Sequence, residues 1–167
     1  MSIKDKLKEL GLTLPTAALP IAAYVPAVKT GSLVFVAGQL PLVDGKVVKE
    51  GKVGKEVTPE EAKDMAQLCA LNALAAISLV ADIDQIEKIV RVGGFVNGIS
   101  GFTAIPQIIN GASDLFVKLF GEVNGKHART AIGVAELPLN SPVEVEVLFE
   151  LIENDYSKNK ATLKILK

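Results

Sequence analysis

The sequence predicts an α+β domain, in which a mostly antiparallel β-sheet carries two helices on one face in the order β-β-α-β-α-β-β. Two long segments have helical periodicity, and short apolar runs of strand length flank them. Apolar residues make up 49% of the 167 residues, which excludes intrinsic disorder. We therefore expect a single domain over residues 1–167, with a helical extension at 1–14 and a C-terminal tail at 152–167.

The first elements are predicted from apolar spacing and turn residues. Apolar residues at helical spacing predict a short helix over 3–10. An apolar run bounded by Gly and Pro predicts a buried strand over 32–41. The Asp44-Gly45 pair is a strong hairpin-turn signal, so a second, short strand is expected within 43–48.

The clearest helix is predicted over about 59–81. Thr58 and Glu61 form a capping box, and Pro59 suits the first helical position. One apolar stripe should face the sheet, formed by Ala62, Met65, Ala66, Cys69, Ala73, Ile77 and Val80. Cys69 is the only cysteine, so no internal disulfide can form, and we expect its side chain to be a buried small hydrophobe.

The second half of the chain is predicted to contain a strand, a helix and a hairpin. The strand covers 86–98 and the helix covers roughly 104–121, with "NGAS" at 110–113 as a candidate interruption. Two further strands, over 128–137 and 142–151, are expected to pair as an antiparallel hairpin across "PLNS".

Strand alternation then predicts which side chains face the helices. The last strand has one apolar face, which must lie under the helices, and Glu144 lies on the other face. In the preceding strand, apolarity assigns Ile132 to the helix side and Arg129 to the opposite side. A face with small and apolar residues but no helix predicts an oligomer whose sheets face one another. The expected hairpin separates Arg129 from Glu144 by about 26 Å, so a site that uses both must be built from two subunits.

Charge and composition exclude several other classes of function. The net charge is −1 and Trp is absent, so neither phosphate-backbone binding nor base stacking is favoured. The N-terminus is too charged for a signal peptide, and no apolar run has transmembrane length. A cytoplasmic location with no membrane partner is expected.

Two motifs resemble the Rid (reactive intermediate deaminase) family, also called YjgF or L-PSP endoribonucleases. The first is "RTAIGVAELPLNSPVEVEV" at 129–147, and the second is "YVPAVKTGSLVFVAGQLP" at 24–41. The resemblance covers about residues 18–151, and the longer second-helix segment is similar to a larger, less characterised subgroup. It implies a chorismate-mutase-like fold and a homotrimer with an inner barrel of sheets and clefts between subunits. It also implies hydrolysis of enamines or imines such as 2-aminoacrylate to 2-keto acids and ammonia, without metal or organic cofactor. The expected enzyme is thus a hydrolase like 2-iminobutanoate/2-iminopropanoate deaminase.

The resemblance also implies roles for individual residues. Arg129 binds the substrate carboxylate, which a planar guanidinium can do through two parallel hydrogen bonds. Glu144 from a neighbouring subunit handles the water or the proton. Tyr24 and the main chain of Gly38 line the pocket. Ala131 also lines it through its main chain, but it stands where well-studied members have a cysteine.

Asn97 and His127 complete the candidate substrate-binding residues. His127 is the only histidine, and it replaces a proline of shorter members. Two roles stay open for it: an exposed position in a loop or at the subunit seam, or a titrating role, because the unperturbed pKa of histidine is near neutrality. Asn97, like Ser113, is also of a type common in turns and caps.

Two other functions stay open. Because Ala131 removes the thiol, the protein could be a non-catalytic trimer that binds small carboxylates or regulates a partner. The endoribonuclease label is disfavoured by the acidic balance, the few aromatic residues and the single histidine.

Overall fold

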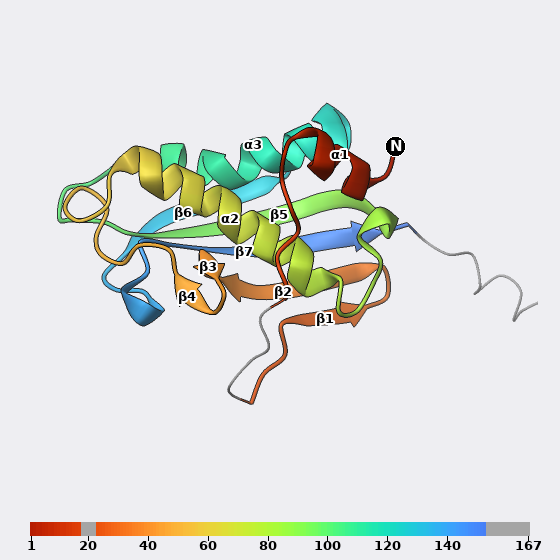
Figure 1. The fold of residues 1–167 in the computed structure, drawn as a ribbon, viewed down its shortest axis with the longest axis horizontal. Coiled ribbons are helices and arrows are strands. Elements are labelled where there is room, and N and C mark those ends of the chain that lie inside the picture. The colour runs from red at the N-terminus through yellow and green to blue at the C-terminus, as the bar shows by residue number, and fades with distance from the viewer. Residues whose placement is uncertain (18–22, 153–167) are drawn as a thin grey trace, which may run out of the picture.

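The computed structural model describes residues 1–17 and 23–152, and its largest feature is a five-stranded sheet with helices on one face (Figure 1). In spatial order the strands are β1 (Ala27–Thr30), β2 (Leu33–Gln39), β7 (Val143–Leu151), β5 (Ile86–Asn97) and β6 (Ala128–Val134). All neighbours pair antiparallel except β5 and β6, which pair parallel. The α+β class and the mostly antiparallel sheet are confirmed. The predicted C-terminal tail lies outside the described residues beyond Ile152.

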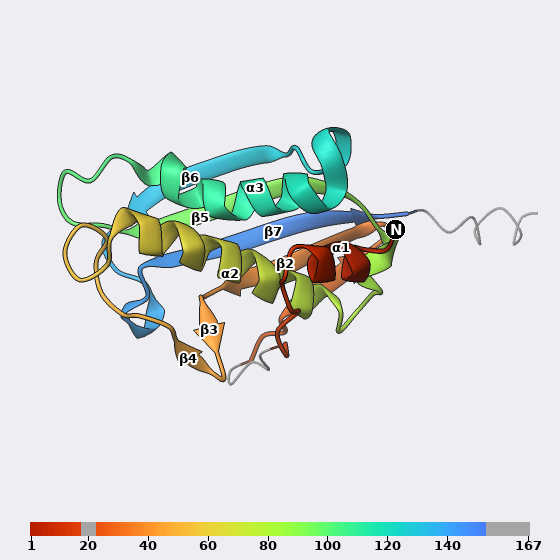
Figure 2. The ribbon, with the colours of Figure 1, turned by 45° about the horizontal axis from the view of Figure 1, so that its top comes forward.

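Three helices lie on the covered face of the sheet. The long helices α2 (Pro59–Ile77) and α3 (Ile105–Asn124) run side by side across it, and α1 (Ile3–Glu9) packs near one end (Figure 2). The main-chain N–H of Ile3 donates to Asp84 at 2.6 Å, which ties α1 to the turn before β5. The short N-terminal helix is confirmed. No helix in the described part of the chain is long and apolar enough to cross a membrane.

Helix α2 begins as predicted and ends earlier. The Thr58 side chain accepts from the Glu61 N–H at 3.2 Å, and the Glu61 carboxylate accepts from the Thr58 N–H at 2.8 Å. The helix ends at Ile77, and Ser78 is its C-cap residue. Val80 is therefore 39% exposed, whereas the rest of the predicted stripe is buried.

Helix α3 runs without interruption through the "NGAS" stretch. Gly111 lies where α3 crosses α2, and a Cβ at this position would overlap the main-chain carbonyl of Lys63. This glycine thus permits close approach of the two helices rather than breaking one. The irregularity comes later, at Gly121, whose φ of +79° interrupts the helical geometry.

The expected hairpin between the last two strands is wrong. Arg129 of β6 pairs with Val92 of β5, and Val92 pairs on its other side with Val147 of β7, so β5 lies between β6 and β7. The chain passes from β6 through a short 3₁₀ turn, η2 (Pro138–Asn140), and enters the sheet on the far side of β5. The strand-helix-strand order of β5, α3 and β6 explains the difference, because such a crossover places two strands in parallel.

The predicted turn at Asp44-Gly45 is confirmed. Both residues have positive φ, +49° and +75°, as a two-residue hairpin requires. The strands that it joins, β3 (Leu42–Val43) and β4 (Lys46–Val47), form a separate two-stranded sheet instead of extending the main one.

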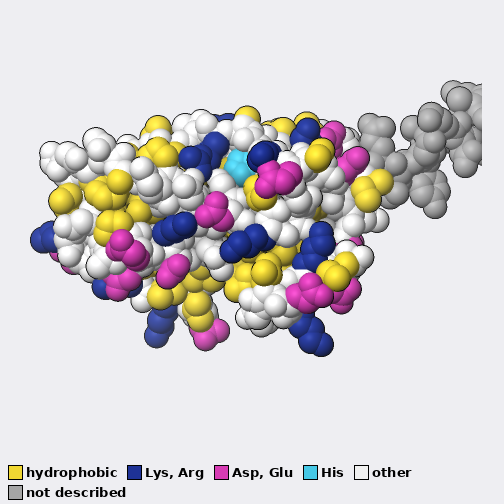
Figure 3. Space-filling model, turned by 90° about the horizontal axis from the view of Figure 1, so that it is seen from above, with side chains coloured by type: hydrophobic (Ala, Val, Ile, Leu, Met, Phe, Trp, Pro, Cys, Tyr) yellow, Lys and Arg dark blue, Asp and Glu magenta, His cyan; other side chains and the backbone are white. Residues whose placement is uncertain are grey.

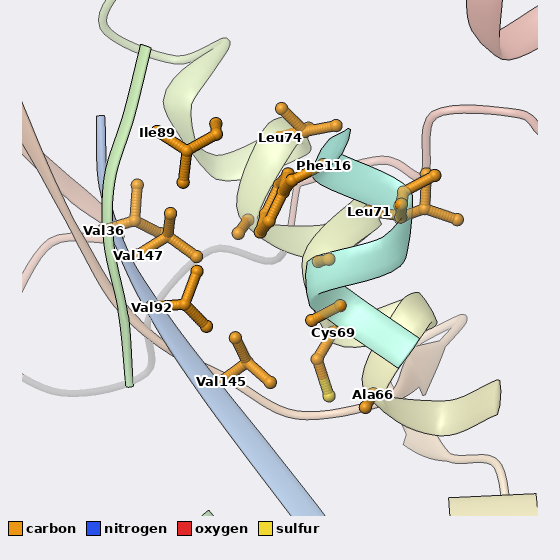
Figure 4. Packing of buried hydrophobic residues seen from close by; sticks show 14 of the residues in the cluster. Val36, Ala66, Cys69, Leu71, Leu74, Ile89, Val92, Phe116, Val145 and Val147 are labelled. Carbon is orange, nitrogen blue, oxygen red and sulfur yellow. The ribbon is translucent and has the colours of Figure 1, made fainter. Parts of the chain in front are cut away.

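The core fills the space between the sheet and the two long helices. Val92, Val145 and Val147 of the sheet point toward Cys69 of α2 and Phe116 of α3 (Figure 4). The side chains of β7 alternate between buried and half-buried, so its valines face the helices and Glu144 faces away, as predicted. Cys69 is fully buried, and burial raises its pKa well above the usual range.

The predicted orientation of β6 is wrong. Arg129 bonds to residues of α3, and a Cβ at Gly133 would lie 3.0 Å from Ile105 of α3, so both face the helices. Ile132 lies on the open face and is 45% exposed. On this edge strand α3 packs against small side chains, so apolarity indicates the wrong face.

Candidate active site

A cluster of four side chains, the Arg129 cluster, lies between the edge strand β6 and helix α3. Its members are Asn110, Ser113, His127 and Arg129. The Nη1 of Arg129 donates to the Asn110 Oδ1 at 2.7 Å and to the Ser113 Oγ at 3.2 Å. Asn110 and Ser113 are three residues apart in α3, so they lie on the same helix face.

The two bonds at Nη1 leave one edge of the guanidinium available. Nη1 has two N–H groups, and Asn110 and Ser113 accept one each. Within residues 1–17 and 23–152, no side chain or carbonyl accepts from Nε or Nη2. These two nitrogens present parallel N–H groups, the geometry that a carboxylate binds with two hydrogen bonds. Arg129 is exposed, so an incoming anion can reach this edge.

His127 extends the cluster behind Ser113. Its Nε2 lies 3.0 Å from the Ser113 Oγ, its Nδ1 lies 2.7 Å from the Gly125 carbonyl oxygen, and its ring contacts Phe116 edge to face. Burial lowers the pKa of His127 below its usual value, the hydrogen bond to Gly125 opposes this, and the Arg129 charge adds to it. The imidazole is half-buried and reaches the surface among basic side chains (Figure 3, cyan).

Ala131 and Gly133 continue the helix-facing side of β6 beyond Arg129. Ala131 is partly buried against the core, and its methyl group offers no reactive atom. Gly133 borders a cavity of about 410 Å³, whose wall also includes Lys52, Phe102 and Ile105.

Glu144 and Gly38 come together on the opposite, open face of the sheet. A Cβ at Gly38 would overlap the Glu144 carboxylate, so the absence of a side chain lets this carboxylate lie against the main chain of β2. Burial raises the pKa of Glu144, and the nearby Glu146 raises it further. Arg91 donates to Glu146 at 2.8 Å rather than to Glu144.

The remaining two candidates lie apart from both groups. Tyr24 precedes β1 and is 57% exposed. Asn97, at the end of β5, is fully buried; its Oδ1 accepts from the Lys52 Nζ at 2.6 Å, and its Nδ2 donates to the Ser141 carbonyl at 3.2 Å.

The sequence does not indicate Asn110 as a site residue, and it indicates only a turn or cap role for Ser113. The signal that could have revealed them is their i, i+3 spacing within the predicted helix that precedes the Arg129 strand. Reading 110–113 as a candidate helix interruption concealed that spacing.

Comparison with known proteins agrees with the fold. A family model described as "YjgF/chorismate mutase-like, putative endoribonuclease" matches residues 4–151. Protein TCP17 of Trypanosoma cruzi is 40% identical over 150 residues, covering 89% of this chain and 94% of that protein. A 2-iminobutanoate/2-iminopropanoate deaminase of Dermatophagoides farinae is 30% identical over 135 residues, covering 81% and 91%.

A solved structure extends the agreement to three dimensions. The crystal structure of protein Atu1372 from Agrobacterium tumefaciens, described as of unknown function, has a TM-score of 0.82 and 41% identity. The match covers 90% of this chain and 92% of that one. The family model spans nearly all of the described residues, including both strands that carry Arg129 and Glu144. The chain therefore belongs to the YjgF/chorismate mutase-like family.

Proposed function

We propose that this protein hydrolyses small enamine or imine acids, such as 2-aminoacrylate and its imine tautomer, to 2-keto acids and ammonia. The observation that carries the proposal is the Nε/Nη2 edge of Arg129, which no group of residues 1–17 and 23–152 occupies and which Asn110 and Ser113 orient through their bonds at Nη1. Such an edge recognises a planar carboxylate, the group common to these substrates. The deaminase among the relatives supports the reaction class.

The reaction needs a water molecule and proton transfer, but no thiol. The water oxygen forms a bond to the imine carbon while the C=N π pair moves to nitrogen. The tetrahedral product then expels ammonia as its hydroxyl proton leaves, and the 2-keto acid remains. Glu144 is suited to move these protons, because burial raises its pKa from the usual glutamate value in the direction of neutral pH.

The site that we propose combines two subunits. In one chain Arg129 faces α3 and Glu144 faces the open side of the sheet, so they cannot hold one small ligand between them. The open face also exposes Val28 and Phe35 by 52% and 50%, which favours its burial in an assembly. We propose a homotrimer in which Glu144 and Gly38 of one subunit meet Arg129 of the next.

A coupled assay tests the proposal. A serine or threonine dehydratase releases 2-aminoacrylate from serine, and pyruvate formation is followed with and without this protein. We expect acceleration by the wild type and none by Arg129→Ala at a concentration where both have the same oligomeric state. Retained acceleration in Arg129→Ala would refute the assignment of this site.

Ala131 favours one alternative, a trimer that binds carboxylates without turnover. Such binding would require the Arg129 edge and no thiol. Saturable binding of pyruvate or 2-ketobutyrate that depends on Arg129, together with no acceleration in the coupled assay, would select this alternative.

A further inference from the structure

The Arg129 cluster forms a continuous hydrogen-bonded chain with a fixed direction. A carbonyl oxygen only accepts, so the His127 Nδ1 must carry the proton that it donates to Gly125. In the neutral ring Nε2 is then an acceptor, and the Ser113 hydroxyl donates to it. The Ser113 oxygen in turn accepts from the Arg129 Nη1. A single hydroxyl therefore connects the imidazole to the guanidinium.

The direction of the Ser113 hydroxyl is not the usual one for a serine within a helix. Such a hydroxyl commonly bonds to the carbonyl one turn earlier in its own helix. Here the Ser113 hydroxyl lies between the side chain of Arg129 on β6 and that of His127, which directly precedes β6. Ser113 and Asn110 together restrain Nη1, which fixes the plane in which Nε and Nη2 meet an anion.

We propose that Ser113 and His127 position the Arg129 guanidinium and couple carboxylate binding at Arg129 to proton uptake by the imidazole. This inference rests on the proposed carboxylate site. While the site is empty, the guanidinium charge opposes a second positive charge on the ring. A bound carboxylate compensates that charge, so protonation of Nε2 becomes easier. The Ser113 hydroxyl then rotates, and its oxygen accepts from both neighbours.

The other charges around His127 do not replace this coupling. Lys88 of β5 and Glu150 of β7 line the same shallow hollow as His127, and they have opposite signs. Lys126, next in the chain, is paired with Glu122. On α3, Asp114 is paired with Lys63 and is exposed. Arg129 is the charged group linked to the ring through a hydrogen-bonded intermediary.

The single histidine makes the test site-specific. The ring is followed by ¹H–¹⁵N NMR across a pH titration of the intact protein, with and without saturating 2-ketobutyrate, which stays ionised throughout. We expect the Nδ1–H tautomer in the neutral ring and a pKa that rises on binding, by an amount equivalent to a change of about 5–10-fold in affinity, at the lower end of the range for coupled sites. An Nε2–H tautomer, an unchanged pKa, or a fall in pKa would overturn the inference.

Linkage supplies an independent measurement of the same coupling, because the affinity for 2-ketobutyrate must change by the same factor. Calorimetric titrations at pH 5.5 and pH 7.5 are made in the Glu144→Gln background, so that Glu144, whose pKa is raised by burial, cannot contribute to the pH dependence. We expect tighter binding at pH 5.5, a flat profile in His127→Gln, and a reduced pH dependence with weaker binding in Ser113→Ala. Lys126→Ala is the control for loss of a neighbouring charge and should keep the full pH dependence.

The outcomes separate this inference from the proposed function. If 2-ketobutyrate fails to bind, or binds equally to Arg129→Ala, the carboxylate site itself is refuted. If binding requires Arg129 but Ser113→Ala and His127→Gln keep both the affinity and the pH dependence of the parent, only the positioning and coupling roles are refuted.

Discussion

Arg129 and Glu144 lie on opposite faces of one sheet, with β5 between their strands. Arg129 is level with Val147, three residues along β7 from Glu144. Their Cα atoms are on the order of 14 Å apart, which is less than in the hairpin expected from the sequence. The two side chains nevertheless point away from each other, because the sheet lies between them. A ligand that meets both groups must therefore take them from different subunits.

Replacement of Arg129 by lysine should weaken binding of 2-ketobutyrate by about 10–100-fold, because an ammonium group cannot make the paired hydrogen bonds of the guanidinium edge. Arg129→Ala should weaken it at least as much. Calorimetric titration measures both. Lys126→Ala removes a cation three residues before Arg129, directly before His127, and should leave the affinity unchanged. An equal loss of affinity there would indicate a general charge effect.

Gly38→Ala should keep the fold and lower the activity. The added methyl group displaces the flexible end of Glu144 rather than main chain, so the cost in stability should be small. The displaced carboxylate should lower kcat in the coupled assay by at least 10-fold, within the usual contribution of a general acid or base. Binding of 2-ketobutyrate should change less than kcat. Wild-type kcat in Gly38→Ala would argue against a proton-transfer role for Glu144.

Glu144→Gln should stabilise the protein at neutral pH more than at pH 4. Burial raises the folded-state pKa of Glu144, so the contribution of this group to stability is fully present below its unfolded pKa and is lost as pH rises through the folded value. The glutamine does not ionise and avoids that loss. Thermal unfolding at a series of pH values measures the difference. Glu150→Gln, on the same strand and face, is the matched control, and an equal pH-dependent gain there would contradict this explanation.

Gly111→Ala should destabilise the fold by about 1–3 kcal/mol, because the new methyl group overlaps the main chain of α2 at Lys63 and the helices must separate. Chemical denaturation measures the loss. Lys118→Ala, at an exposed position of the same helix, should have little effect. A Gly111→Ala protein as stable as wild type would mean that the helices do not cross so closely.

The parts of the fold that local signals encode were predictable. The capping box at Thr58 and the Asp44-Gly45 turn each combine residues that satisfy their own backbone geometry, and the structure contains both. The pairing of β6 was not predictable from its turn, because "PLNS" is as short as a hairpin loop but joins strands on either side of β5.

The prediction of the site was wrong for β6, because packing against α3 decides which of its side chains face the helices. Ala131 and Gly133 have no strong apolar signal, yet they face the helix layer, where Ala131 packs against the core and Ile105 of α3 lies close to Gly133. Arg129 alternates in step with Ala131 and Gly133, so its predicted face was wrong for the same reason. Its bond to Asn110 also needs the crossover of α3 above β6, which alternation within a strand cannot reveal.

The central claim is that Arg129 and Glu144 act in one site across a subunit boundary, and subunit mixing tests it directly. Arg129→Ala and Glu144→Gln chains, each inactive alone in the coupled assay, are unfolded together and refolded as mixed oligomers. In a cyclic assembly about a quarter of the interfaces then combine an intact Arg129 with an intact Glu144, so activity should return to about a quarter of the wild-type value. Activity that stays at the level of the separate variants, in oligomers shown to contain both chains, would contradict the shared site.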